Sequence, residues 1–220
     1  MIKILYILVT FIVPYSCATP NQPKSEGKTA ITAQYIEKDG ESSAYFASGC
    51  FWCVEAIFES VTGVTEAISG YAGGEIVDPS YQQVASGSTR HAEAVRVIYD
   101  PEVITYETLV KVFYGSHDPT TLNQQGPDRG YQYRSAIFYK SDEEKMIADK
   151  VTEELREAKV YNAAITTDIT EFTNFYDAEE YHQDFERKNP NQSYVRAVSV
   201  PRLNRFKSNF PELLKEDVSH

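Results

Sequence analysis

The pattern of apolar and polar positions divides most of the chain into alternating strand-like and helix-like segments. Strands are predicted where apolar, aromatic and β-branched residues cluster or alternate with polar ones, at residues 43–47, 64–71, 91–99, 133–139 and 165–172. Helices are predicted where apolar residues recur every three or four positions, at residues 50–61, 105–115, 141–155 and 178–188. Several of these segments are separated by short turns, which limits how far apart they can lie in the fold.

Strands interleaved with helices predict an α+β protein, a single-domain two-layer α/β sandwich with a mixed or antiparallel sheet. A thioredoxin-like fold would use similar elements, so the order of elements does not decide between the two. The composition, 42% hydrophobic and 24% charged, is that of a globular body. The net charge of −11 and the pI near 4.9 argue against nucleic acid or an anionic membrane surface as partner, because both would repel the chain.

The N-terminal part of the chain predicts export and a tether. Residues 4–13 form an apolar run that is too short to span a bilayer but suits the core of an export signal, so residues 1–18 are predicted to be a signal peptide. Alternatively, Cys17 resembles the lipid-bearing cysteine of a bacterial lipoprotein signal. Residues 19–42 then form a flexible polar tether to one domain, residues 43–220. We therefore expect a protein of the bacterial periplasm, or one anchored to the membrane through lipidated Cys17, rather than a cytoplasmic protein.

The segment with the clearest chemistry is Cys50-Phe51-Trp52-Cys53, at the junction of a predicted strand and a predicted helix. Unpaired N–H groups and the helix dipole at such a junction favour a thiolate, so Cys50 is the candidate nucleophile. Cys53 follows one helical turn later, with its Cα roughly 5 to 6 Å away, close enough to form a disulfide with an oxidised Cys50. Two other interpretations stay open: half of a zinc site, and a purely structural disulfide.

Other polar residues could assist this cysteine. In the strand 91–99, alternation directs Glu93 to the same face as Val95 and Val97, so that its carboxyl group would be buried and held as an acid. A glutamate exposed at the end of the strand is the alternative. Tyr81, Asp128 and Tyr133 lie in or beside loops rich in Gly and Pro, where site residues collect, although each could equally be structural.

Eight short motifs occur in an order that resembles the A-type peptide methionine sulfoxide reductases, and together they cover about residues 45 to 190. They are Gly49-Cys50-Phe51-Trp52, Gly70-Tyr71-Ala72-Gly73-Gly74, Pro79-Ser80-Tyr81, His91-Ala92-Glu93, His117-Asp118-Pro119-Thr120, Gln125-Gly126-Pro127-Asp128, Gln132-Tyr133-Arg134-Ser135 and Tyr181-His182-Gln183. The resemblance implies a two-layer α/β sandwich of ferredoxin-like type with a mixed sheet. Eight ordered motifs are far more specific than one pair of cysteines.

The resemblance also implies roles for individual residues. Cys50 corresponds to the nucleophile that attacks the sulfur of methionine-(S)-sulfoxide, and Glu93 to the acid that protonates the departing oxygen. Tyr81 and Tyr133 correspond to hydroxyl groups that hydrogen bond to this oxygen. Such donors are needed because a sulfoxide oxygen is a poor leaving group until it is protonated.

The remaining implied roles concern substrate binding and recycling. Phe51 and Trp52 correspond to the apolar cradle for the S-methyl group, and Asp128 to a residue beside the substrate backbone. The reaction would leave Cys50 as a sulfenic acid, which condenses with a second thiol. Many family members have Gly at the position of Cys53 and use a cysteine in the C-terminal tail instead. Because no cysteine follows Cys53, this CFWC variant is expected to resolve through Cys53.

The predicted function is thus the reduction of methionine-(S)-sulfoxide in proteins or as the free amino acid, by a monomer without bound cofactor or metal. Thioredoxin or a thioredoxin-like dithiol would supply the electrons, and oxidised proteins or peptides would be the substrates. Two alternatives from other classes are a general disulfide oxidoreductase, which needs only Cys50 and Cys53, and a zinc-stabilised binding module.

Overall fold

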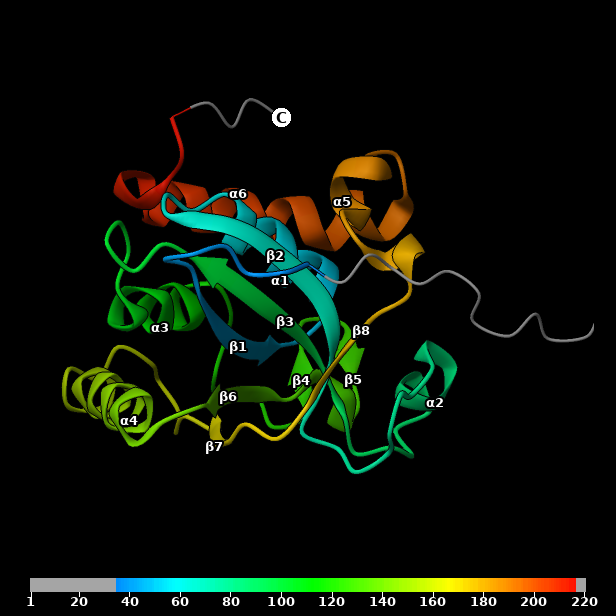
Figure 1. Cartoon of the computed structure of the whole chain (residues 1–220), viewed down its shortest axis with the longest axis horizontal. Coiled ribbons are helices and arrows are strands. Elements are labelled where there is room, and N and C mark those ends of the chain that lie inside the picture. The colour runs from blue at the N-terminus through cyan, green and yellow to red at the C-terminus, as the bar shows by residue number, and fades with distance from the viewer. Residues whose placement is uncertain (1–34, 217–220) are drawn as a thin grey trace, which may run out of the picture. The chain divides into compact units, whose positions relative to one another are not determined.

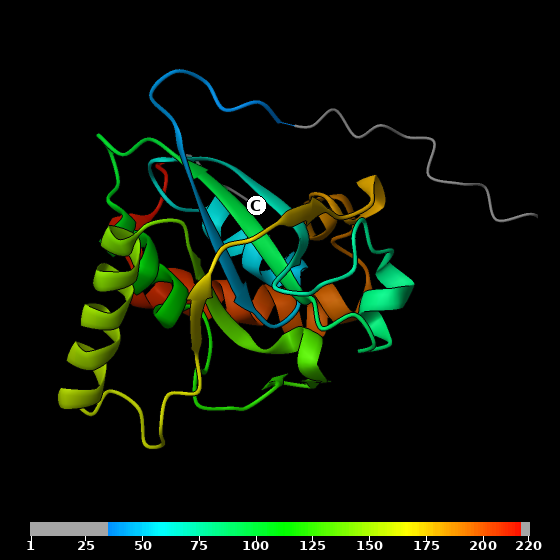
Figure 2. The same ribbon diagram turned by 60° about the horizontal axis from the view of Figure 1, so that its bottom comes forward.

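Six strands form a mixed, strongly curled sheet within residues 35–216, the part of the chain that this computed structural model describes (Figures 1 and 2). The strand order is β7-β6-β1-β3-β2-β8, and β6–β7 is the parallel pair of this sheet while its other pairs are antiparallel. The strands are β1 (Ser42–Ser48), β2 (Val64–Ala72), β3 (Ala92–Tyr99), β6 (Ser135–Tyr139), β7 (Asp168–Glu171) and β8 (Phe175–Asp177). The predicted single α/β domain with a mixed sheet is confirmed, and the ferredoxin-like form of the sandwich stays a prediction.

Helices and short turns of helix connect these strands. The α-helices are α1 (Phe51–Glu59), α2 (Tyr81–Ala85), α3 (Tyr106–Gly115), α4 (Asp142–Glu157), α5 (Phe185–Lys188) and α6 (Val200–Asn209). The other turns are η1 (Tyr131–Tyr133), η2 (Glu180–His182), the π-helical η3 (Val195–Ser199) and η4 (Pro211–Leu213). In the long loop after α3, β4 (Gln124–Gln125) and β5 (Asp128–Arg129) form a two-stranded ribbon.

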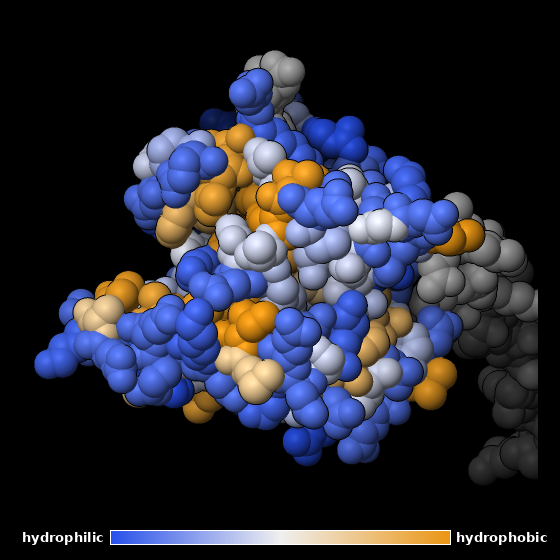
Figure 3. Space-filling view, turned by 60° about the vertical axis from the view of Figure 1, so that its left-hand side comes forward, coloured by the Kyte–Doolittle hydropathy of each residue, from blue (hydrophilic) through white to orange (hydrophobic). Residues whose placement is uncertain are grey.

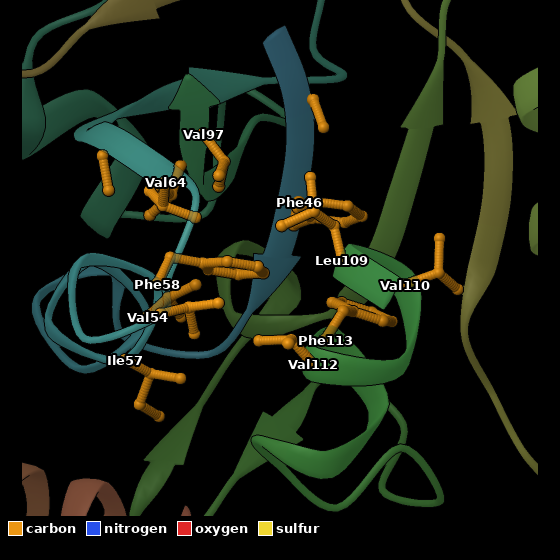
Figure 4. Close-up of a cluster of buried hydrophobic side chains, with 14 of the residues drawn as sticks. Phe46, Val54, Ile57, Phe58, Val64, Val97, Leu109, Val110, Val112 and Phe113 are labelled. Carbon is orange, nitrogen blue, oxygen red and sulfur yellow. The ribbon is translucent and has the colours of Figure 1, made fainter. Parts of the chain in front are cut away.

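The main hydrophobic core lies between one face of the sheet and helices α1, α3, α4 and α6. Figure 4 shows the part of this core that α1 and α3 form with the strands. The strand alternation directs Phe46 of β1 into this core, where its ring stacks on Phe58 of α1 at 5.2 Å and on Phe113 of α3 at 5.4 Å. Burying a ring of this size stabilises the fold by about 1.5–3 kcal/mol. This packing fixes α1, and with it the cysteine pair, against the centre of the sheet.

The opposite face of the sheet carries a smaller apolar cluster. Tyr45 of β1 stacks on Phe172 at 4.0 Å and contacts Phe175 at 5.5 Å, and Phe138 of β6 packs in the same cluster. The segment between β7 and β8 therefore covers this face. It leads the chain across the sheet to the opposite edge, where β8 pairs with β2.

Two predicted strands differ from the structure at their ends. The strand predicted at 133–139 begins only at Ser135, because Tyr133 belongs to the helical turn η1. The strand predicted at 165–172 is reduced to β7, because the N–H of Thr166 donates to the carbonyl of Pro119 instead of to a neighbouring strand. In both places a loop with its own hydrogen bonds replaces the end of the ladder.

The C-terminal part differs most from the prediction. The helix predicted at 178–188 is interrupted at Asp184, whose φ of 55° is left-handed, so that only η2 and the short α5 remain. The sequence pattern predicts no element after residue 188, yet α6 follows. Its apolar residues Leu203 and Phe206 are too few to give a clear period, but they are buried.

The predicted signal peptide, Cys17 and most of the predicted tether lie outside the described residues. Within residues 35–216, none of the helices combines the length and the apolar character that crossing a bilayer requires. Figure 3 shows the side of the molecule on which α3 and α4 lie. This surface is mainly hydrophilic, with small hydrophobic patches. Large apolar side chains that are exposed, such as Met146 and Val160, are scattered along the chain.

Candidate active site

The turn between β1 and α1 presents Cys50. Gly49 has a φ of 90°, and a Cβ there would lie 2.6 Å from the Cβ of Gln125, so this position requires glycine. Cys50 then occupies the N-cap of α1, with φ −54° and ψ 123°. The strand-to-helix junction predicted from the sequence is confirmed.

Cys53 lies on the first turn of α1, and its N–H donates to the carbonyl of Cys50 at 3.2 Å. Both cysteines are free thiols, and their side chains hydrogen bond to each other. Cys50 is 6% exposed and Cys53 is 1% exposed. The structure therefore shows a reduced dithiol whose two sulfurs are neighbours, with the first of them closer to solvent.

The charge on this pair is not placed as the sequence predicts. Burial raises the pKa of Cys50 well above its ordinary value, and the neighbouring Cys53 raises it further. By contrast, the hydrogen bond from Cys50, the positive charge of Arg202 and the hydroxyl of Ser199 lower the pKa of Cys53 despite its burial. Desolvation thus outweighs the helix N-terminus at Cys50, and the anionic form is favoured at Cys53.

Glu93 lies on β3 directly beside the cysteine turn. The N–H of Phe51 donates to its Oε2 at 3.1 Å, and its side chain is 2% exposed. Burial raises its pKa to about 8, against the lowering effect of that hydrogen bond. The buried position expected from the strand alternation is confirmed, and at neutral pH most of this carboxyl group carries a proton.

An aromatic cluster adjoins the cysteine turn. The Nε1–H of Trp52 donates to Nδ1 of His182 at 3.1 Å, and the Trp52 ring stacks on Phe185 at 3.8 Å. The Phe51 ring contacts His182 at 4.9 Å and stacks with Tyr81 at 6.4 Å. Two of these three partners, His182 and Phe185, lie about 130 positions later in the chain than the side chains of α1 that they orient.

Tyr81, Tyr133 and Asp128 come from three separate segments to the same region. Tyr81 begins α2, whose N-cap Ser80 forms a full capping box with Gln83. Burial raises the pKa of Tyr81 to about 12 and that of Tyr133 further, and the charges of Glu93 and Asp128 act on both hydroxyl groups. Both phenols therefore remain neutral hydrogen-bond donors at neutral pH.

The C-terminal segment supplies site residues for which the sequence gives little signal. The hydroxyl of Tyr194 donates to Oδ2 of Asp128 and also hydrogen bonds to the two cysteines. Ser199 of η3 and Arg202 of α6 approach Cys53 from the same segment. None of Tyr194, Ser199 and Arg202 belongs to a motif that the sequence analysis singles out.

A group of carboxyl side chains lies on the far side of α1. Among the described residues, Glu55, Glu59 and Asp184 are the group whose oxygens lie close enough together to hold a metal ion, and neither cysteine belongs to it. The same three residues line a cavity of about 700 Å³ between α1, α5 and α6. Glu55 itself hydrogen bonds to the hydroxyl of Ser69 and accepts the N–H of Asp184.

The stability of the fold is expected to depend on pH through Glu55. Burial raises its pKa from 4.5 to about 8, so between these values the folded chain holds a proton that the unfolded chain has lost. The free energy of unfolding should therefore fall as the pH rises through this window, by at most about 1.4 kcal/mol per pH unit for this group. Glu55→Gln, which keeps the hydrogen bonds without ionising, should weaken this fall.

Thermal melts of the parent and the Glu55→Gln variant at pH 6 and pH 9 test this expectation. The melting temperature of the variant minus that of the parent should be larger at pH 9 than at pH 6. Glu157→Gln, an exposed glutamate of α4, is the matched control and should follow the parent at both pH values. An identical difference between Glu55→Gln and the parent at pH 6 and pH 9 would contradict the assignment.

Comparisons with known proteins match the same region of the chain. A family model described as "Peptide methionine sulfoxide reductase" matches residues 42–214. The chain is 50% identical over 178 residues to "Peptide methionine sulfoxide reductase MsrA 1" of Rhodopirellula baltica, an alignment that covers 81% of this chain and 92% of that relative.

Solved structures give the same match. The reduced form of Mxr1 from Saccharomyces cerevisiae superposes with a TM-score of 0.68 at 37% identity, covering 73% of this chain and 92% of that one. Mxr1 in complex with Trx2 gives a TM-score of 0.51 at 29% identity, covering 70% of this chain and 91% of that one. The matched residues include every position of the cysteine turn and of β3.

Proposed function

The chain belongs to the A-type peptide methionine sulfoxide reductases, and we propose that Cys50, Cys53 and Glu93 carry out its reaction. The protein is an oxidoreductase that reduces methionine sulfoxide to methionine. The observation that carries the assignment of residues is the cysteine turn itself. Cys50 has slight exposure at the N-terminus of α1, and the adjoining N–H of Phe51 is hydrogen bonded to the buried carboxyl of Glu93.

In the first step, the sulfur of Cys50 attacks the sulfur of the sulfoxide. Glu93, whose pKa of about 8 keeps it protonated at neutral pH, gives its proton to the sulfoxide oxygen, and the hydroxyls of Tyr81 and Tyr133 stabilise the charge that develops there. In sum, the sulfoxide loses its oxygen and becomes the sulfide of methionine. The thiol of Cys50 gains that oxygen and becomes a sulfenic acid.

Two aromatic side chains define the apolar side of the substrate site. Trp52 is held by His182 and Phe185, and Phe51 packs against His182 and Tyr81, so both rings are fixed in position. We assign them to contact the methyl group on the sulfoxide sulfur. A site that offers hydrogen-bond donors to the oxygen and aromatic rings to the methyl group can distinguish the two epimers of the sulfoxide. We assign this site to the S epimer, with Asp128 beside the substrate backbone.

In the second step, Cys53 resolves the sulfenic acid, as expected for a CFWC variant. Its lowered pKa favours the attacking thiolate, and the one-turn separation keeps it beside Cys50. The thiolate attacks the sulfur of the sulfenic acid, a disulfide bond forms, and the oxygen leaves as water after taking up a proton. Both cysteines end one oxidation step above the thiol, and methionine has already left.

A thioredoxin or a thioredoxin-like dithiol is the proposed electron donor, as supported by the structural likeness to Mxr1 in its complex with Trx2. Oxidised proteins and peptides are the proposed substrates, and the enzyme is proposed to act as a monomer without a bound cofactor.

From the apolar run at residues 4–13 and from Cys17 we also propose export, either to the periplasm or to a membrane to which a lipid on Cys17 anchors the protein. The donor would then be a thioredoxin-like protein supplied with electrons from the membrane.

The proposal is tested with a peptide whose methionine sulfoxide is present as separated S and R epimers, using dithiothreitol as reductant. The S epimer alone should be consumed, with one methionine formed for each sulfoxide lost. Cys50→Ser, assayed in parallel, controls for direct reduction by dithiothreitol. Consumption of the R epimer alone would refute the assignment, and full activity on a disulfide substrate with none on either epimer would favour a general disulfide oxidoreductase.

A further inference from the structure

Arg202 is a buried cation placed against the cysteine turn. It lies on α6, is 6% exposed, and its Nε–H donates to the carbonyl of Ser116 at 2.8 Å. Its Nη2 donates to Oγ of Ser48 at 3.1 Å, and its Nη1 lies 3.6 Å from where a Cβ on Gly49 would stand. These anchors hold the guanidinium beside the two residues that precede Cys50, although neither anchor carries a charge.

No ion pair within residues 35–216 includes this guanidinium, although an unpaired buried cation is costly. Its charge acts on three titratable groups: Asp128, His117 and Cys53. The Asp128 carboxylate is already hydrogen bonded to Tyr194, and burial holds His117 neutral with a pKa of about 3. The groups that can compensate the cation are therefore the carboxylate of Asp128, which is half-buried, and the thiolate of Cys53, which is buried next to the turn that holds the guanidinium.

We propose that Arg202 stabilises the thiolate of Cys53 and thereby directs the reduction of the Cys50–Cys53 disulfide, so that the donor attacks Cys50 and Cys53 leaves. This inference rests on the proposed roles of the two cysteines. Two geometric observations support it. The guanidinium is buried beside the cysteine turn, and the side chain of Cys50 is 6% exposed whereas that of Cys53 is 1% exposed. A donor sulfur approaching from solvent meets Cys50 first.

A thiolate of the donor dithiol forms a disulfide bond with the sulfur of Cys50, the Cys50–Cys53 bond breaks, and its electron pair remains on Cys53 beside Arg202. The second thiol of the donor then attacks the donor sulfur of the mixed disulfide, releasing Cys50, which takes up a proton. The donor is oxidised by two electrons, and the cysteine pair is reduced by two.

Other groups that face Cys53 come from each element around it. They are the thiol of Cys50 from α1, the hydroxyls of Ser199 from η3 and Tyr194 before it, and the carboxyl of Glu93 from β3, on whose pKa the charge of Cys53 acts. Glu186 bonds to the same Ser199 hydroxyl. Of these groups none is a cation, so removing the charge of Arg202 should raise the pKa of Cys53.

The test uses Arg202→Gln, which keeps hydrogen-bonding groups without the charge, and Arg202→Lys, which keeps the charge. Rapid quench measures the first burst of methionine, steady-state assays with dithiothreitol or thioredoxin measure recycling, and alkylation of Cys53 against pH, followed by mass spectrometry, measures its thiolate. Arg205→Gln, which removes an exposed arginine from the same helix, is the matched control.

For Arg202→Gln, recycling should fall roughly 10-fold more than the burst, because a neighbouring cation lowers a pKa by one to three units and a poorer leaving thiol slows exchange. The alkylation midpoint of Cys53 should move to higher pH. Arg202→Lys should recover much of both effects, and Arg205→Gln should match the parent. If the Gln variant does not fold, Arg202→Met serves as the uncharged variant.

Equal losses of burst and recycling with an unmoved Cys53 midpoint would overturn the inference and leave Arg202 a structural residue. Equal values for Arg202→Lys and Arg202→Gln would also overturn it. Failure of the proposed function looks different: the parent itself would give no burst, or Cys53→Ser would recycle as fast as the parent, with every arginine intact.

Discussion

Replacing Cys50 with serine is expected to abolish methionine formation, with a fall of at least about 10³-fold to the background of the reductant. A serine hydroxyl is a far weaker nucleophile toward sulfur and cannot form the sulfenic acid. The fold should persist, because serine is close to cysteine in size and its hydroxyl can keep hydrogen bonds to Cys53 and Tyr194. Rapid quench with a methionine sulfoxide peptide measures the loss, and any burst of methionine from Cys50→Ser would refute its role as nucleophile.

Cys53→Ser is the informative partner of this variant. It should form one methionine per chain in the burst and then stop with thioredoxin as donor, because the sulfenic acid of Cys50 has no neighbouring thiol. Cys17 is the third cysteine of the sequence, and both variants are therefore made in a Cys17→Ser background. Repeated turnover of Cys53→Ser with thioredoxin at the parental rate would remove Cys53 from the cycle.

Replacing Glu93 with glutamine is expected to slow the burst by about 10²-fold to 10⁴-fold, the range for removal of a positioned acid. The parent should also show a characteristic pH dependence. Because the pKa of Glu93 lies at about 8, its protonated form is lost as the pH rises through that value, and the burst rate should fall with it. In Glu93→Gln the already low rate should no longer show this fall.

Glu55→Gln is the matched control for this prediction. Glu55 is a second buried glutamate with a pKa raised to about 8, but it lies on the other side of α1 and bonds to Ser69. The burst of Glu55→Gln should keep both the parental rate and the fall above pH 8. A fall that persists unchanged in Glu93→Gln would assign the titration to another group.

The part of the site nearest to the cysteine turn could be predicted from sequence because it depends on local rules. A strand predicted at 43–47, followed by Gly49 and by a helix predicted from Cys50, gives the position of both thiols. Alternation along one strand gives the burial of Glu93. These short-range patterns extend over a few residues, and each can be recognised without knowing what packs against it.

The electrostatics of the pair could not be predicted in the same way. The helix N-terminus at Cys50 is visible in the sequence, whereas the burial that opposes it depends on neighbours from elements far along the chain. Arg202 lies 149 positions after Cys53 (202 − 53), in a helix with too few apolar residues to be predicted. A single sequence gives no signal that such a residue lies beside the cysteines.

The predicted ends of some strands and helices were wrong for a related reason. Tyr133 is aromatic and precedes an apolar run, which favours a strand, but the turn after Gly130 makes it helical. Asp184 stops a helix because its N–H is bonded to the carboxyl of Glu55 from α1. In each case a contact from outside the segment overrides the local preference of the residues.

The two sulfurs lie within one turn of one helix, and this changes what the end of the polypeptide has to do. In an enzyme whose resolving cysteine lies in a C-terminal tail distant from the nucleophile, the tail has to carry that cysteine to the nucleophilic sulfur during each cycle. With Cys53 as the proposed resolving cysteine, the oxidative half of the cycle needs no such movement, and the tail can stay in place. The tail supplies no sulfur of its own to this cycle. It supplies the phenol of Tyr194, the hydroxyl of Ser199 and the guanidinium of Arg202, which surround sulfurs from another part of the chain.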